Sequence, residues 1–195
     1  VSVGSEMCIR DSPCEVRCRR SMMDASINIR GLKRFAVEHA GDVPVPAPLP
    51  STGKKVAVIG GGPGGISAAY YLALMGHAVT IFESKKKLGG MLRYGIPSYR
   101  LPREILDKEI AELMSVGITV KTETHVGENP SIIDLKKDFD AVYIAIGAQT
   151  DKKIGIEGED AKGVVSAVEM LRGIGDDEMP DFKGKDLSLI HISEP

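Results

Sequence analysis

The stretch KKVAVIGGGPGGISAAYYLALMGHAVTIFE, residues 54–83, decides the fold of this chain. It opens with the apolar run 56–59, which is typical of a short strand buried on both faces. A glycine-rich turn follows and leads into an apolar helix-forming segment, which Gly76 ends. Residues 77–82 then predict a second strand. The order strand, glycine turn, helix and strand favours a parallel α/β sheet.

The glycines of the turn have G-x-G-x-x-G spacing. Gly60 permits a tight turn, Gly62 has no Cβ to keep a diphosphate from the backbone, and Gly65 lets the helix lie close to the strand. With Pro63 and Gly64 between them, they place the unpaired amides and the positive dipole end of the helix beside a bound phosphate. The spacing therefore indicates a dinucleotide-binding turn.

An acidic residue, Glu83, follows the second strand, where its carboxylate can bind two ribose hydroxyls. The glycine spacing by itself also occurs in ordinary turns. The flanking strand, helix, second strand and terminal acid all agree with dinucleotide binding, so that interpretation is preferred.

Composition excludes several other classes of function. The 195 residues include 25 basic and 27 acidic side chains, and the net charge of −2 gives no reason to expect nucleic acid or an acidic membrane surface as a partner. No apolar run is long enough to span a bilayer, and nothing resembles a secretory signal. The three cysteines all precede residue 19 and form no disulfide framework, which favours a reducing, cytoplasmic setting.

The two ends of the chain share an unusual relation. DNA that encodes EMCIRDS, residues 6–12, can be reverse-complemented into DNA that encodes LSLIHIS, residues 187–193. Such inverted ends resemble transposon-type sequencing adapters. We therefore expect residues 1–12 and 187–195 to be adapter-derived and leave them out of the fold prediction.

The segment PCEVRC carries Cys14 and Cys18 in a C-x-x-x-C pair. Two such thiolates can be neighbouring ligands of an iron–sulfur cluster, although a cluster usually needs four. Without further context, two free cysteines in a helical turn are the alternative. Residues 27–39 have a helical apolar pattern that predicts packing against another element, and the proline-rich residues 42–50 predict an extended linker.

The loop after Glu83 is rich in glycine and basic residues, and a long loop beside a dinucleotide site is usually functional. The lysines 85–87 are interpreted as a solvated turn. The glycine pair 89–90 permits a second close approach of backbone to phosphate. Arg93 and Arg100 are candidates to contact the same phosphates, with surface ion pairs as the alternative.

The remaining elements continue the α/β alternation. A helix is predicted over 103–116, a strand over 118–126, a short helix over 130–136 with Asn129 as its cap, and a buried strand over 139–146. Because ligands bind beyond the carboxyl ends of parallel strands, the turn with Gly147 belongs on the same side as Gly62 and Glu83. His125 lacks a partner acid or nucleophile, so it is interpreted as structural.

Three segments together, VAVIGGGPGG, LGGMLRYGIPSYRLP and FDAVYIAIGA, resemble the flavoprotein half of the glutamate synthase small-subunit family. The flavin segment of dihydropyrimidine dehydrogenase is similar too. The resemblance covers residues 13 to about 185 and implies a doubly wound, Rossmann-like FAD-binding domain, preceded by the end of a helical [4Fe-4S] domain. It also implies hydride transfer from NAD(P)H to the flavin, then electron transfer to a ferredoxin-like partner or a synthase large subunit.

The resemblance assigns roles to individual residues. It implies Gly60, Gly62 and Gly65 as the FAD diphosphate turn, Glu83 as the ribose ligand, Gly90 and Met91 along the cofactor, Arg100 at its phosphate, Val126 at the adenine, and Cys14 and Cys18 as cluster ligands.

The same resemblance gives a domain layout. It implies an iron–sulfur remnant over 13–44, a linker over 45–53, the FAD domain over 54–150, and over 151–186 the approach to an NAD(P)H domain whose glycine fingerprint is missing. The remaining cluster cysteines are missing too, so we expect this chain alone to be inactive. The alternative is a non-catalytic or NAD-only nucleotide-binding module, which would not need the GGMLRYGIP loop.

Overall fold

The computed structural model describes residues 13–41, 43–153 and 155–185. The chain divides into two compact units, residues 1–44 and 45–195. The two terminal segments predicted to be adapter-derived, residues 1–12 and 187–195, lie outside the described residues.

The first unit holds α2 (Pro13–Val16), a 3₁₀ helix η1 (Arg19–Met22) and α3 (Ile29–His39). The Asn28 side chain caps α3 by accepting a hydrogen bond from the Gly31 amide. Glu15 ties α2 to α3, because its carboxylate accepts a hydrogen bond of 2.8 Å from the Arg30 amide. The predicted helix is confirmed, but its apolar side chains, including Leu32 and Phe35, are exposed among the described residues.

The second unit contains a four-stranded parallel sheet with the order β3-β2-β1-β4. Its elements in chain order are β1 (Lys55–Ile59), α4 (Pro63–Leu74), β2 (Ala78–Phe82), α5 (Met91–Tyr94), α6 (Arg103–Met114), β3 (Thr119–Lys121), α7 (Ile132–Asp138), β4 (Ala141–Ile144) and α8 (Ala167–Gly175). The predicted parallel α/β fold is confirmed.

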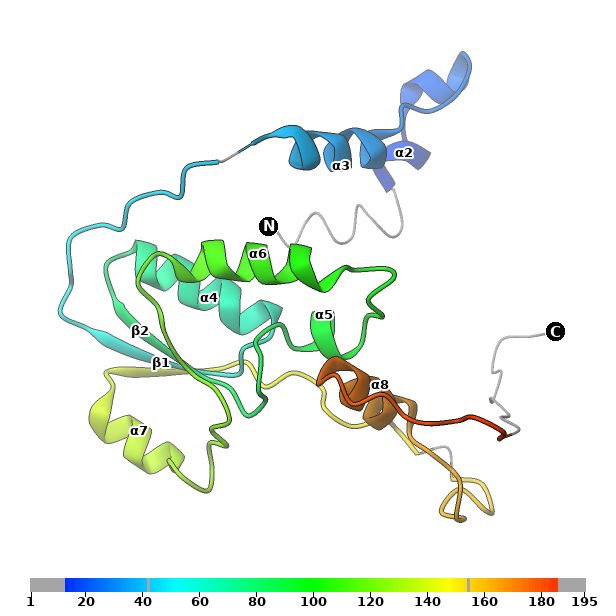
Figure 1. The fold of residues 1–195 in the computed structure, drawn as a ribbon. Helices are drawn as coiled ribbons and strands as arrows, with labels where there is room; N and C mark the ends of the chain where they lie inside the picture. The colour runs from blue at the N-terminus through cyan, green and yellow to red at the C-terminus, as the bar shows by residue number, and fades with distance from the viewer. Residues whose placement is uncertain (1–12, 42, 154, 186–195) are drawn as a thin grey trace. The chain divides into compact units, whose positions relative to one another are not determined.

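Helices cover both faces of the sheet (Figure 1). Val58 and Ile81 point to the face on which α4 and α6 lie, where they form the larger hydrophobic cluster. Ala57 and Ile59 point to the opposite face, where Leu135 of α7 packs. Residues 56–59 are therefore buried on both faces, as the continuous apolar run predicts.

Three predicted elements need correction. The strand predicted over 118–126 is only β3, because the chain beyond Lys121 turns to run past the end of β2, where the Thr124 amide donates to the Glu83 carbonyl. Ser131, and not Asn129, caps α7, and its hydroxyl accepts from the Asp134 amide in a capping box.

The third correction concerns β4, which was predicted to be buried. Tyr143 is 46% exposed and Ile144 60% exposed, because β4 pairs with β1 alone in the described sheet and lies at its edge. Among the described residues, no helix has both the length and the hydrophobicity needed to cross a membrane.

Candidate functional site

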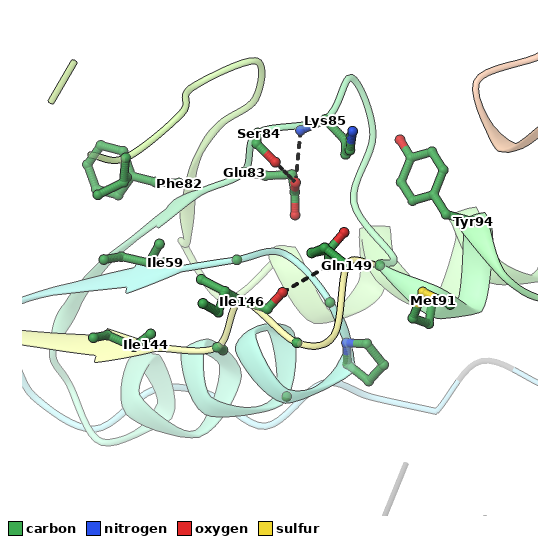
Figure 2. Close-up of a pocket in the computed structure, with 18 of the residues that line it drawn as sticks. Ile59, Phe82, Glu83, Ser84, Lys85, Met91, Tyr94, Ile144, Ile146 and Gln149 are labelled. Carbon is green, nitrogen blue, oxygen red and sulfur yellow. Dashed lines mark hydrogen bonds between the residues drawn. The ribbon is translucent and has the colours of Figure 1, made fainter. Parts of the chain in front are cut away.

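A cavity of about 550 Å³ lies beyond the carboxyl ends of the strands. Figure 2 shows part of its lining, which comes from the ends of β1, β2 and β4, the first turn of α4, the loop after β2, and α5 and α8. The predicted site residues that line it are Gly60, Gly62, Pro63, Gly64, Glu83, Gly90, Met91, Val126 and Gly147. Residues scattered over nearly ninety positions of sequence thus meet in one concave space.

The three glycines of the turn differ in what the fold demands of them. Gly60 has a φ of 105°, and a Cβ there would lie 2.3 Å from the Ala145 carbonyl oxygen. A Cβ on Gly65 would lie 1.9 Å from the Gly60 carbonyl oxygen, so the helix could not approach the turn. Gly62 has an ordinary extended backbone, with φ −81° and ψ −178°. The fold itself therefore does not require glycine at position 62.

The space beside Gly62 is open. A Cβ there would meet no atom nearer than the Gly90 Cα, 3.6 Å away. Gly90 has a φ of 51°, and its own Cβ would lie 2.6 Å from the Gly62 Cα, so the two glycine turns touch backbone to backbone. Gly62 is the N-cap of α4 and provides no side-chain cap, which leaves the first amides of the helix to a ligand.

Glu83 is 7% exposed and lines the cavity. Its Oε2 accepts a hydrogen bond of 2.7 Å from the Gly61 amide, and its Oε1 accepts one of 2.8 Å from the Lys85 amide. In Figure 2 the carboxylate points toward the side of the cavity on which Ile146 and Gln149 lie. Glu83 therefore holds the glycine turn and the following loop together while it faces the cavity.

These two hydrogen bonds predict that Glu83→Gln lowers the stability of the protein before any ligand is added. A glutamine amide has one acceptor oxygen, so its NH₂ group would face the Gly61 or the Lys85 amide and leave a buried donor unpaired. We expect a loss of roughly 1–3 kcal/mol in the free energy of unfolding, measured by urea denaturation without flavin. The exposed Glu104→Gln is the control, and equal stability of the two variants would contradict the proposed contact.

Tyr94 was not predicted as a site residue, yet it is 6% exposed and lines the cavity. Its hydroxyl donates to an Asp176 carboxylate oxygen at 3.1 Å. Burial, together with the Asp176 charge, raises the pKa of Tyr94 to about 12.

The raised pKa predicts a pH dependence of stability. In the unfolded chain Tyr94 ionises near pH 10, about two units below its pKa in the folded protein. Its contribution is thus fully present below pH ~10 and is lost as the pH rises toward ~12. Urea unfolding of the wild type and Tyr94→Phe should differ by a constant amount up to that range, after which the wild type loses its advantage. Parallel curves throughout would contradict the assignment.

The family comparison agrees with this geometry. Residues 54–188 match the family model described as pyridine nucleotide-disulphide oxidoreductase. The chain belongs to the pyridine nucleotide-disulphide oxidoreductase family. The matched residues begin at β1 and include every described strand of the sheet.

Curated proteins are similar to this chain over most of its length. NADP(+)-dependent formate dehydrogenase subunit beta of Moorella thermoacetica is 41% identical over 91% of this chain and 29% of that protein. The glutamate synthase [NADPH] small chain of Bacillus subtilis is 36% identical over 92% of this chain and 39% of that protein. The resemblance to the glutamate synthase small-subunit family is confirmed. The chain thus spans well under half the length of these relatives.

A solved structure supports the same fold. Mycobacterium tuberculosis FprA in complex with NADPH gives a TM-score of 0.57 at 24% identity over 67% of this chain and 32% of that chain. At this identity the likeness concerns the fold alone. The residues that line the cavity lie within the part of the chain that matches the pyridine nucleotide-disulphide oxidoreductase family.

The arginines of the loop after β2 do not meet in the cavity. Arg93 is 3% exposed; it forms an ion pair with Asp107 of α6 and donates to the Leu88 carbonyl at 2.7 Å. It therefore joins α5 to α6. This agrees with the alternative interpretation of Arg93 as an ion-pair residue, except that its side chain is buried and not on the surface. Arg100 is exposed, 5.9 Å from the Tyr99 ring centre, and is not among the residues that line the cavity. Its contact with phosphate remains a prediction.

Other lining residues carry charge or polarity that the sequence pattern did not reveal. They include Lys85, His125, Gln149 and Arg172. His125, interpreted from sequence as structural, is an exposed residue of the lining. Lys86 and Lys87, interpreted as a solvated turn, form exposed ion pairs with Glu178 at 3.3 Å and Asp177 at 2.9 Å. Sequence alone gave no signal for these contacts, because about ninety residues separate the partners.

Cys14 and Cys18 are both partly exposed free thiols. A hydrogen bond from the Ile27 amide, followed by one from the Arg20 amide, lowers the pKa of the Cys18 thiol and favours a thiolate. Across the part of the chain that the structure describes, no group of three or more potential ligand side chains gathers around one point. These residues do not make a complete [4Fe-4S] site, which needs four ligands. The cluster-ligand role of the two cysteines remains a prediction.

Proposed function

We propose that this chain binds FAD across the carboxyl ends of its strands. The observation that carries the proposal is Gly62, whose backbone any residue could adopt and whose missing side chain leaves open space in the cavity. Glycine there benefits a ligand that must touch the backbone. A diphosphate against the first amides of α4 is such a ligand.

The residues present fit the cofactor. Gly62, Pro63, Gly64 and Gly90 form a floor of exposed backbone at the start of α4. An ionised carboxylate has about four lone-pair sites. The Gly61 and Lys85 amides and the Ser84 hydroxyl donate to Glu83, which leaves capacity for a ribose hydroxyl. Val126 lines the same cavity and is proposed at the adenine. Met91 and Gly147 are proposed along the rest of the cofactor.

The chemistry of the whole protein follows from this cofactor. When bound, FAD accepts a hydride from NAD(P)H and releases electrons singly. The chain's own residues hold the diphosphate and orient the ribose. The relatives compared above are named as a subunit beta and a small chain.

Those names support electron transfer to a partner subunit or domain. Cys14 and Cys18 are proposed as two ligands of an iron–sulfur cluster whose other ligands come from outside the described residues. We further propose a cytoplasmic setting, and that the 195-residue chain does not oxidise NAD(P)H by itself.

Purification of the chain under native conditions tests the proposal directly. We expect a yellow protein whose denatured supernatant contains FAD, identified by chromatography against FMN and riboflavin. Titration of the flavin-free chain should give binding of FAD and much weaker binding of NAD+. A colourless protein that binds NAD+ but not FAD would support the NAD-only alternative and refute the proposal.

A further inference from the structure

A cationic side chain on α8, Arg172, lines the cavity that we assign to the dinucleotide. It is partly buried, and its guanidinium donates to the Gln149 carbonyl. Among the described residues, the ion pairs of the structure leave Arg172 without a carboxylate partner, whereas Arg93 has Asp107 and Arg34 has Glu38. One donor of five is engaged, so this fork can still bind an anion.

The position of Arg172 is fixed through the end of β4. Gln149 follows Gly147 in the loop after β4, and its side-chain Nε2 donates to the Ile146 carbonyl at 2.8 Å, as Figure 2 shows. The Arg172 guanidinium binds the backbone of this same residue, so one short chain of hydrogen bonds links the strand end to α8. Arg172 is therefore held at the mouth of the sheet and does not extend freely into solvent.

The far end of α8 is also fastened. Gly175 packs against Tyr94, since a Cβ there would lie 2.4 Å from the tyrosine ring. The next three residues, Asp176, Asp177 and Glu178, contact Tyr94, Lys87 and Lys86 respectively. These contacts attach α8 to α5 and to the loop that begins at Glu83. The helix that carries Arg172 is thus a wall of the cavity.

The lining contains two cationic side chains that can attract a negatively charged ligand. Glu83 already accepts two amide hydrogen bonds, while Lys85 and Arg172 supply two positive charges. We propose that Arg172 binds the diphosphate of the dinucleotide and is a cofactor-binding residue of this chain. The inference rests on the proposed function and adds a ligand contact that the glycine turn alone does not provide. Arginine suits the role because its planar fork can engage two phosphate oxygens together.

The test separates the diphosphate from the rest of the ligand. The flavin-free chain is titrated calorimetrically with ADP and with adenosine, for the wild type, Arg172→Gln and Arg172→Lys. We expect Arg172→Gln to weaken ADP binding about tenfold, the size expected for one charge-assisted hydrogen bond, and to leave adenosine binding within about twofold. Arg172→Lys should fall between, because it keeps the charge but loses the fork.

Salt and a matched variant supply the controls. The advantage of the wild type over Arg172→Gln for ADP should shrink as salt rises, because salt screens charge pairs. Lys136→Gln removes the same charge from the exposed face of α7 and should bind ADP as the wild type does. FAD and NAD+ titrations identify which dinucleotide is affected.

The outcomes distinguish this inference from the proposed function. Equal ADP binding by the wild type and Arg172→Gln, with FAD still bound, overturns the role of Arg172 and leaves FAD binding intact. An equal loss for ADP and adenosine, with a lower melting temperature, also overturns it, since Arg172 would then only hold α8 in place. Failure of the wild type to bind either FAD or ADP overturns both.

Discussion

Replacing Gly62 by valine is expected to abolish FAD binding while the protein stays folded. The valine methyl groups would occupy the space beside Gly62, which no other side chain fills, and would hold a diphosphate away from the amides of α4. We expect at least a ~100-fold weaker affinity, which is about 2.7 kcal/mol, measured by titration of flavin fluorescence. Because the Gly62 backbone is extended, the flavin-free protein should stay folded, with a loss of about 1 kcal/mol since valine is a poor N-cap.

The size series Gly62→Ala and Gly62→Ser refines this test. Alanine adds only the Cβ and should weaken FAD binding less than valine does. Serine is a slightly better N-cap than glycine and should stabilise α4 by roughly a few tenths of a kcal/mol while it still impairs binding. Ser67→Val places the same branched side chain on α4 away from the cavity lining and is the control. Normal FAD binding by Gly62→Val would rule out the diphosphate at this turn.

Replacing Gly65 by alanine, three residues further on, is expected to destabilise the fold itself, even without flavin. Its Cβ would lie 1.9 Å from the Gly60 carbonyl oxygen, a backbone atom that cannot rotate away. The helix would have to move from the turn and from Val58 of β1. We expect a loss at or above the upper end of the ~1–3 kcal/mol that overpacking usually costs, measured by urea denaturation without flavin.

The neighbouring glycine provides a matched control. A Cβ on Gly64 would meet nothing within 4 Å, so Gly64→Ala should be neutral or stabilising, since alanine favours a helix. The two variants differ by one position in one helix. If they unfold at the same urea concentration, the close approach of α4 to the glycine turn is wrong.

The part of the fold that sequence predicts best is the part with short-range signals. Residues 54–83 contain their own strand, turn, helix and strand, and the structure follows them within one or two residues. The correct cap of α7 was also encoded locally, because Ser131 and Asp134 have the spacing of a capping box. The prediction of Asn129 as the cap is wrong because Asn129 lies two residues before this capping box.

The rest of the site depends on contacts between distant segments. Arg93 pairs with Asp107 across two helices, and Arg172 reaches the Gln149 carbonyl 23 residues away, and neither contact follows a helical or strand period. The burial of β4 was wrongly predicted. An apolar run indicates that a strand can be buried, but it does not show whether the described chain contains an element that covers the strand. The glycine turn, with Glu83, was predictable because each residue has a backbone reason or a chemical reason of its own.

The exposed edge of β4 has a consequence for handling the protein. In the described sheet its outer amide and carbonyl groups pair with no strand, and Tyr143, Ile144 and Ile146 beside them are exposed, so this edge can pair with another β-strand. At high concentration, copies of this chain should therefore associate edge to edge and precipitate. A charged substitution on β4 outside the cavity lining, such as Ala141→Lys, would be the first remedy to try when the chain is expressed.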